Sequence, residues 1–157
     1  MSTENNLEQY IRQENLNLQY EQGTAKNIFG TDYTVSISSP EHYMDVSEVR
    51  YAPREIDLKT VCGYHQDLYG IKDDYNYMAH MLSHEISHTE THLIGTTLAA
   101  AILLTATKNA IQKRSPKSFV LGGLLSIGVK FITDELCAET AAYLIHGSSL
   151  ETDIKLF

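Results

Sequence analysis

The sequence predicts one mainly helical domain of the α+β class with a small N-terminal sheet. Short segments of alternating polar and apolar residues lie in its first part, whereas apolar residues at helical spacing dominate from about residue 74 onward. The chain has 157 residues, of which 43% are hydrophobic, and this is enough to bury the core of one domain. We expect residues 1–24 to form a polar arm or short helix and residues 25–157 to form the domain.

Two segments have the pattern of strands. Residues 32–38 (DYTVSIS) alternate between apolar and polar side chains and include β-branched residues. Residues 48–58 (EVRYAPREIDL) have a similar pattern, which Pro53 interrupts. We therefore expect two strands of a small sheet, packed on the helix that follows.

A helix is predicted from about residue 74. Either Asp73 or Asp74 has the side chain of a residue that caps a helix N-terminus. The apolar residues that follow are mostly three or four positions apart, namely Tyr75, Met78, Met81, Leu82 and Ile86. This spacing indicates a helix with one buried face.

Two apolar stretches, residues 93–107 and 119–132, follow this helix and are separated by a basic connection. Each is shorter than the roughly 18 to 20 apolar residues that cross a bilayer unaided, so we expect buried core helices. A membrane hairpin with a basic loop is the less favoured interpretation, and an apolar face used for homo-oligomerisation is another. Ser115 and Pro116 are typical of an N-cap and a first helical position, and Gly147 is typical of a helix end.

The segment MLSHEISHTETH contains His84 and His88, four residues apart. One helical turn puts both imidazoles on one face, where a metal ion can bridge them. Glu85 lies between them, and in an HExxH motif of this kind the glutamate takes a proton from a zinc-activated water. The spacing therefore predicts a Zn²⁺ site with Glu85 as the catalytic base.

A catalytic zinc also needs a third protein ligand and an open position. Residues 134–142 (DELCAETAA) supply Glu135 and Glu139, which are four apart on a predicted helix. One of them can bind the metal while the other hydrogen-bonds a ligand histidine. His92 is on the same helical face as the motif but lies roughly 12 Å along the helix axis from His84, so we expect it to support the site rather than bind the metal.

These two segments resemble a known family. YNYMAHMLSHEISHTETH followed by DELCAETAAYL is similar to the zincin metallopeptidases that use a glutamate as third ligand, in particular the peptidase domain of ArdC-type antirestriction proteins and the HtpX-type peptidases. The resemblance implies a zincin-like fold in which a long C-terminal helix carries the third ligand. It also implies that Glu135 binds the metal and that Glu139 supports the site.

The leading hypothesis is a zinc metallopeptidase, an endopeptidase rather than an exopeptidase, acting on a protein or peptide. Such enzymes bind substrate along an edge strand, for which Tyr33–Ser38 and Arg50–Leu58 are candidates. Four side chains are candidates to bind a developing oxyanion, namely Tyr75, Tyr77, Tyr143 and His146. One competing hypothesis is a zinc-stabilised interaction protein without catalysis, of an antirestriction or regulatory type in a phage or mobile element, and another is a metal-free helical scaffold.

Charge and cysteine content restrict the partners and the compartment. The formal net charge of −8 argues against a nucleic-acid partner. Cys62 and Cys137 are far apart and lack the spacing of a disulfide framework. The N-terminal segment lacks the apolar core of a secretory signal. We therefore expect a cytoplasmic protein.

Overall fold

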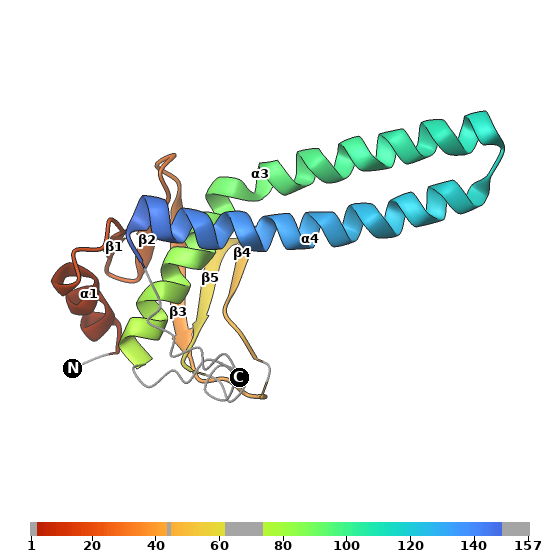
Figure 1. Ribbon diagram of the computed structural model, residues 1–157. Coiled ribbons are helices and arrows are strands. Elements are labelled where there is room, and N and C mark those ends of the chain that lie inside the picture. The colour runs from red at the N-terminus through yellow and green to blue at the C-terminus, as the bar shows by residue number, and fades with distance from the viewer. Residues whose placement is uncertain (1–2, 44, 62–73, 149–157) are drawn as a thin grey trace, which may run out of the picture.

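The computed structural model describes residues 3–43, 45–61 and 74–148, and it has a small α+β domain from which a long helical hairpin extends (Figure 1). The described elements are α1 (Thr3–Gln13), β1 (Gln19–Glu21), β2 (Thr24–Lys26), β3 (Asp32–Ser38), β4 (Glu48–Tyr51), β5 (Arg54–Lys59), α3 (Asp74–Lys113) and α4 (Pro116–His146). The predicted α+β class, with an N-terminal sheet and long C-terminal helices, is confirmed.

The sheet has five strands in the order β1-β2-β3-β5-β4. β3 and β5 are parallel neighbours, whereas the other pairs are antiparallel. In β3, Tyr33 and Val35 are buried and alternate with exposed residues, which is the pattern of a strand with one face against a core. Within the described part of the chain, β4 forms one edge of this sheet and β1 forms the other.

The second predicted strand is wrong in one respect, because residues 48–58 belong to two strands. β4 and β5 pair antiparallel, with Val49 opposite Ile56. Proline has no N–H to donate to a ladder, and the chain reverses at Pro53, where the sequence pattern is interrupted. Sequence analysis also does not predict β1 and β2, because strands of three residues are too short to show a period.

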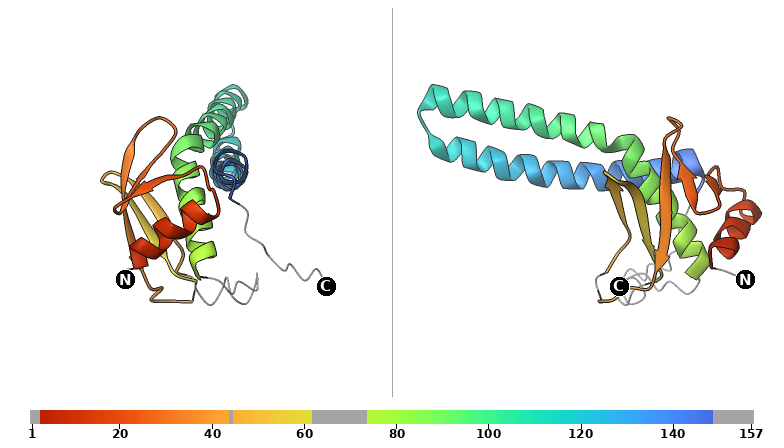
Figure 2. Two further views of the ribbon diagram at one scale, coloured as in Figure 1. Left: turned by 90° about the vertical axis from the view of Figure 1, so that its left-hand side faces the viewer. Right: turned by 180° about the vertical axis from the view of Figure 1, so that it is seen from behind.

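The hydrophobic core lies between the sheet, α1 and the first half of α3 (Figure 2). Its fully buried members include Leu7 of α1, Ile56 and Leu58 of β5, and Tyr77, Leu82 and Ile86 of α3. Complete burial of an aliphatic side chain of this size contributes roughly 1.5–3 kcal/mol. The buried apolar side chains of α3 therefore pack this helix, which carries the histidine motif, against the sheet. α1 packs on the same core.

α3 changes direction where it leaves the sheet and enters the hairpin (Figures 1 and 2). Ser83, Ser87 and Thr91 lie on successive turns before this point, and each hydroxyl donates to the carbonyl oxygen four residues earlier, at 2.9, 2.7 and 2.8 Å. Such bonds compete with the helical ladder and bend helices. This series accounts for a bend just beyond the histidine motif.

The local signals at both ends of α4 are confirmed. α4 begins at Pro116 with Ser115 as its N-cap residue, although the Ser115 side chain makes no capping hydrogen bond. It ends at His146, and the C-cap residue Gly147 has a φ of 69°, the left-handed conformation that favours glycine. α3 begins at Asp74, and the candidate cap residue Asp73 lies outside the described residues.

The prediction of buried core helices at residues 93–107 and 119–132 is wrong. These stretches form the hairpin, in which α3 and α4 contact each other and are otherwise largely exposed (Figure 2). Leu104 is 71% exposed and Leu124 is 65% exposed. A pair of helices covers only one face of each partner, and the described residues supply no third layer over the hairpin. The pattern of a helix does not reveal whether a partner is present to cover it.

Candidate metal centre

Three predicted ligands, His84, His88 and Glu135, lie together where α4 passes beside the histidine motif of α3. Nε2 of His84 is 3.1 Å from Nε2 of His88 and 3.4 Å from Oε2 of Glu135. Nε2 of His88 is 3.6 Å from Oε1 of Glu135. The histidines come from successive turns of one helix and the carboxylate from the other, so the pairing of α3 with α4 assembles the group.

The spacing of these donor atoms fits a zinc ion. Ligands at about 2.0–2.1 Å from a tetrahedral metal ion lie roughly 3.4 Å from one another. The two imidazole nitrogens are 3.1 Å apart, and each lies near a different oxygen of Glu135, at 3.4 and 3.6 Å, which is close to this value. Two imidazoles and one carboxylate are also the donor set of zinc sites that keep one position open. The Glu135 side chain is 46% exposed, so solvent reaches the group from the side of α4.

Glu139 lies one helical turn after Glu135 and contacts the other nitrogen of a ligand histidine. His84 Nδ1 donates to Glu139 Oε2 at 3.0 Å, which leaves His84 Nε2 facing the donor group. His80 Nε2 is 3.4 Å from the same carboxylate oxygen. A carboxylate in this position fixes the orientation of the imidazole and raises its basicity. The structure thus places Glu135 in the donor group, whereas Glu139 contacts His84 on the side of the ring that faces away from the other donors.

Sequence analysis misses His80, although the signal is present, because histidines recur every fourth residue from His80 to His92. His80 is buried, and Ser148 Oγ lies 3.4 Å from its Nδ1. His92, at the other end of this series, is not part of the ligand group, and its Nδ1 donates to the carbonyl oxygen of Thr89 at 3.3 Å. The series therefore extends one turn beyond the two predicted ligands in each direction.

The carboxyl of Glu85, the predicted catalytic base, is buried, with 4% of the residue exposed. Burial raises the pKa of Glu85 to about 7. The charge of His84 opposes this rise, and the nearby carboxylates of Glu135 and Glu48 add to it. The carboxyl is therefore within electrostatic reach of the donor group. A carboxyl with a pKa near neutrality gains and loses a proton in the range where general bases work.

In the absence of a metal ion, the donor group holds a proton on His84. Burial lowers the pKa of His84, but hydrogen bonds to Glu135 and Glu139 outweigh burial and raise the pKa to about 9. Burial and the charge of His84 lower the pKa of His88. The hydrogen bond from His84 lowers the pKa of Glu135. A metal ion at these donors takes the place of a bound proton, so its affinity rises with pH.

The edge strand β4 lies beside the motif. Tyr51 donates its hydroxyl to the carbonyl oxygen of His88 at 3.4 Å, and its ring centre is 5.1 Å from that of His92. Burial raises the pKa of Tyr51 to about 12. Of the two segments predicted to guide a substrate, Arg50–Leu58 contains this tyrosine, whereas Tyr33–Ser38 lies in the interior strand β3. Sequence analysis misses Tyr51, because nothing in the sequence places β4 next to the motif.

The four predicted oxyanion donors have different surroundings. Tyr77 is fully buried in the core, and Tyr143 is exposed. The hydroxyl oxygen of Tyr75 accepts a hydrogen bond from Asn6 Nδ2 at 2.8 Å. His146 belongs to a buried ion pair outside the ligand group. The contacts of these four residues therefore single out none of them as the oxyanion donor.

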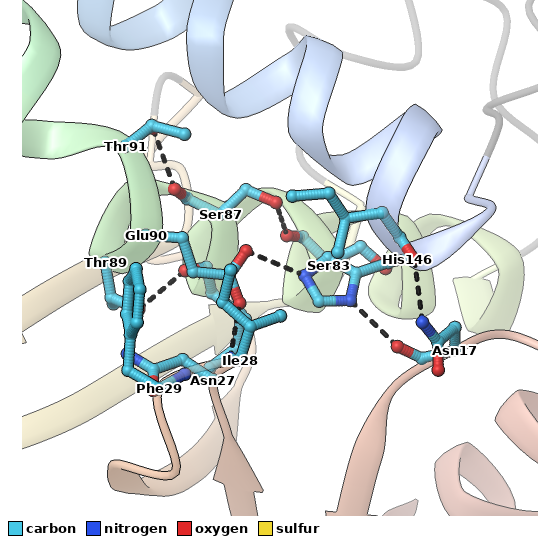
Figure 3. Close-up of polar contacts among 12 residues, drawn as sticks. Asn17, Asn27, Ile28, Phe29, Ser83, Ser87, Thr89, Glu90, Thr91 and His146 are labelled. Atoms are coloured by element: carbon cyan, nitrogen blue, oxygen red, sulfur yellow. Dashed lines mark hydrogen bonds and ion pairs between the residues drawn. The ribbon is translucent and has the colours of Figure 1, made fainter.

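A buried ion pair lies close behind the motif (Figure 3). His146 Nε2 donates to Glu90 Oε2 at 3.1 Å, and His146 Nδ1 donates to the carbonyl oxygen of Asn17 at 2.9 Å. Glu90 also accepts the backbone N–H of Ile28 at 2.9 Å. Because both ring nitrogens face acceptors, His146 is an imidazolium. Burial lowers its pKa, but the bonds to Glu90 and Asn17 outweigh burial and raise it. This pair joins α3, α4 and the N-terminal chain.

Gly95 allows α3 and α4 to approach each other just beyond the site. A Cβ added at Gly95 would lie 2.0 Å from Oδ1 of Asp134 and 3.1 Å from the carbonyl oxygen of Lys130. Asp134 is ion-paired with Lys130, and its buried Oδ1 has no hydrogen-bond partner among the described residues. Because Glu135 follows Asp134, this close approach sets the distance of the carboxylate ligand from α3.

Comparisons with models of protein families, with characterised proteins and with solved structures find no match to this chain. The geometry of the site and the sequence motifs are therefore the observations that bear on function. The described residues provide three donors that can hold one metal ion, a carboxylate behind one of the histidines, and a buried carboxyl of raised pKa nearby.

Proposed function

We propose that the protein is a zinc metallopeptidase of the zincin class and that it cleaves peptide bonds as an endopeptidase. The observation that carries this proposal is the convergence of His84, His88 and Glu135, whose ligand atoms all lie within 4.8 Å of one another and form the donor set of a zinc site with an open position. The resemblance of the two motifs to the glutamate-ligand zincins supports the same conclusion.

Each residue of the site has its own task in this proposal. His84, His88 and Glu135 hold Zn²⁺, which when bound acidifies a water molecule and polarises a carbonyl group. Glu139 keeps Nε2 of His84 turned toward the other donors. Glu85 accepts a proton and returns it to the leaving amine.

We further propose that the substrate is an extended polypeptide segment bound along the outer edge of β4, which pairs with no second strand among the described residues. β4 pairs with β5 on one side, so the backbone groups on its other side can add a strand. Tyr51 of β4 contacts α3 at His88, so a strand added there passes close to the donor group. Such a strand can come from the middle of a chain, which favours an endopeptidase over an exopeptidase.

Metal content and turnover together test the proposal. We expect about one zinc per chain of untagged protein by elemental mass spectrometry, and less zinc in His84→Ala and Glu135→Ala. Glu85→Gln is expected to keep the zinc but to cleave a peptide library roughly 10²–10⁴-fold more slowly, because it lacks the general base. Glu21→Gln, which neutralises an exposed carboxylate on the far edge strand β1, is the matched control and is expected to leave both readouts unchanged.

Two outcomes would overturn the proposal. Well-folded protein that binds no zinc when zinc is supplied would remove the metal site. One zinc per chain with no cleavage of any peptide would favour the alternative of a zinc-stabilised interaction protein, in which the metal ties α3 to α4. That alternative requires a fourth protein ligand, and the donor group found among the described residues has three.

A further inference from the structure

The hairpin has small residues on its inward face and large apolar residues on its outward face. We call residues 93–132 the apolar hairpin. The buried residues at the seam between its helices are Gly95, Ala99, Ala106, Gly122 and Ser126. By contrast, Val120, Leu124, Ile127 and Phe131 lie on the opposite side of α4 and are each more than half exposed. In water the large side chains would occupy the seam, because that arrangement buries the most apolar area. Small residues at the seam are typical of helices packed within lipid.

The exposed apolar surface of α4 is too broad for one protein partner. Its exposed large apolar residues include Phe119, Leu121, Leu124, Leu125, Ile127 and Phe131. At 3.6 residues per turn, these positions span about 240° of the helix circumference. A helix that packs on one partner needs an apolar stripe of roughly 100° and is polar elsewhere, whereas a helix that is apolar all round is surrounded by an apolar medium. This breadth favours lipid over a second copy of the chain.

The hairpin carries basic residues but no acidic ones. Residues 91–133 contain none of the 20 acidic residues. The basic residues of this segment are Lys113, Arg114 and Lys117 at the tip, Lys108 before the tip, and Lys130 near the base, where it is ion-paired with Asp134. A basic cluster at the end of an apolar segment complements the anionic headgroups of a membrane.

Three hydroxyl groups of the hairpin are bonded internally. Thr105 and Thr107 each donate to the carbonyl oxygen four residues earlier, at 2.8 Å. Ser126 donates across the seam to the carbonyl oxygen of Ala99, also at 2.8 Å. A hydroxyl in hydrocarbon needs a protein partner because no water is available to it. These three side chains therefore already satisfy that requirement.

The part of α3 that lies in the hairpin is about as long as a bilayer is thick. From Leu93 to Lys113, α3 extends about 31 Å at 1.5 Å per residue, and the hydrocarbon core of a bilayer is about 30 Å thick. By length and hydropathy, α3 is sufficient to cross a membrane. Lys108 lies before the tip, but its aliphatic stem lets the ammonium group reach the headgroups.

From these observations we propose that the apolar hairpin inserts into a lipid bilayer, with its basic tip in the far headgroup layer and the α+β domain at the near surface. The packing of small residues inside and large apolar residues outside is the main argument. The proposal does not depend on catalysis, because neither the donor group nor Glu85 belongs to the hairpin.

Flotation with lipid vesicles tests this proposal. The 157-residue chain is reconstituted by detergent removal into vesicles of phosphatidylcholine and phosphatidylglycerol and centrifuged through a density gradient. Most of the wild-type protein is expected to float and to remain bound in carbonate at high pH. The double variant Leu124→Asp/Ile127→Asp is expected to reduce the floating fraction at least about tenfold, since a charge within the bilayer is costly. Phe29→Asp, which changes an exposed apolar residue outside the hairpin, is the matched control and is expected to float.

A labelling experiment locates the hairpin in the membrane. In a chain with Cys62→Ser and Cys137→Ser, Ser115→Cys at the tip and Leu124→Cys in the apolar part are placed separately in lipid discs, whose two faces are both open to solvent. A charged maleimide is expected to label position 115 at least about tenfold faster than position 124, because thiols ionise poorly in an apolar medium. Equal labelling would overturn the proposal. So would wild-type protein that stays soluble without detergent, whether as a defined oligomer of this chain or as a monomer that does not float.

Discussion

At the scale of single residues, the two carboxylates of α4 have the same chemistry but different neighbours. Glu135 faces Nε2 of both His84 and His88, whereas Glu139 faces Nδ1 of His84 and the ring of His80. In the proposed enzyme, the first carboxylate is a ligand and the second orients an imidazole. The rotation of α4 about its axis determines which carboxylate faces which histidine nitrogen. Replacing each carboxylate separately therefore tests the two roles.

We predict that Glu139→Ala weakens zinc affinity about 10- to 100-fold, the usual effect of losing a carboxylate that orients a ligand histidine. Glu135→Ala should weaken it further, because one of three protein ligands is lost. Competition with a chromophoric chelator at fixed pH measures both dissociation constants. If Glu139→Ala loses zinc completely while Glu135→Ala retains it, the two roles must be exchanged.

The ion pair of Glu90 and His146 predicts a pH-dependent stability. The pKa of His146 is raised in the folded state, so the native protein binds this proton more tightly than the unfolded chain does. The stabilisation is complete below about pH 6.5, the unfolded value, and is lost as the pH rises through the folded pKa. The free energy of unfolding of the wild type relative to His146→Gln should therefore fall as the pH rises.

Urea unfolding in the presence of a chelator, between pH 6 and pH 10, measures this difference. His42→Gln, which changes an exposed histidine in the β3–β4 loop, is the control for loss of a histidine as such. A difference between wild type and His146→Gln that is the same at every pH would contradict a protonated His146 in the folded protein.

At the scale of secondary structure, the closeness of α3 and α4 depends on Gly95. A Cβ at this position would lie too close to the Asp134 side chain and to the backbone oxygen of Lys130, so the helices must separate. We predict that Gly95→Ala costs about 1–3 kcal/mol, as overpacking usually does, and that it weakens zinc affinity because Glu135 moves with Asp134. Thermal unfolding and zinc titration measure the two effects.

The matched control for Gly95→Ala is Gly123→Ala. Gly123 lies in α4, and a Cβ added there would meet no atom within 4 Å. Alanine is about 1 kcal/mol better than glycine within a helix, so this variant should keep or increase stability and bind zinc normally. If the two alanine variants behave alike, close approach at Gly95 is not what positions the ligand.

The elements differ in how far the sequence determines them. The start of α4 at Pro116 and its end before Gly147 are local effects of one residue each, and both are predicted correctly. The partners of Glu135 and Glu139 depend on the register between two helices that spacing within one helix does not specify. Likewise, Tyr51 approaches His88 only because β4 is the edge strand nearest the motif. What the sequence leaves open is therefore the set of contacts between distant segments.

At the scale of the whole molecule, burial is the property that sequence analysis misjudges. The apolar stretches 93–107 and 119–132 are helical as expected, but large side chains such as Leu104 and Leu124 lie on the surface. Periodicity cannot supply this information, because an apolar face that meets a core and one that meets lipid have the same composition. Exposure in the folded chain, together with small residues at the seam, separates the two cases.

If both proposals hold, the metal site lies at the membrane surface, because Leu93 follows His88 by five residues and Ile132 precedes Glu135 by three. We predict that a peptide anchored to the same vesicle by an acyl chain is cleaved at least about tenfold faster than the same peptide free in solution, since anchoring raises its effective concentration. Cleavage rates in vesicles, measured by fluorescence dequenching, make the comparison.

The variant Leu124→Asp/Ile127→Asp separates the two parts of this prediction. It should lose the preference for the anchored peptide and keep the wild-type rate on the free one, because the substitutions leave the donor group and Glu85 intact. If the variant cleaves neither the anchored peptide nor the free peptide, the hairpin is needed to assemble the site. A wild-type enzyme that cleaves the free peptide as fast as the anchored one would contradict a site at the bilayer surface, even if the hairpin is inserted.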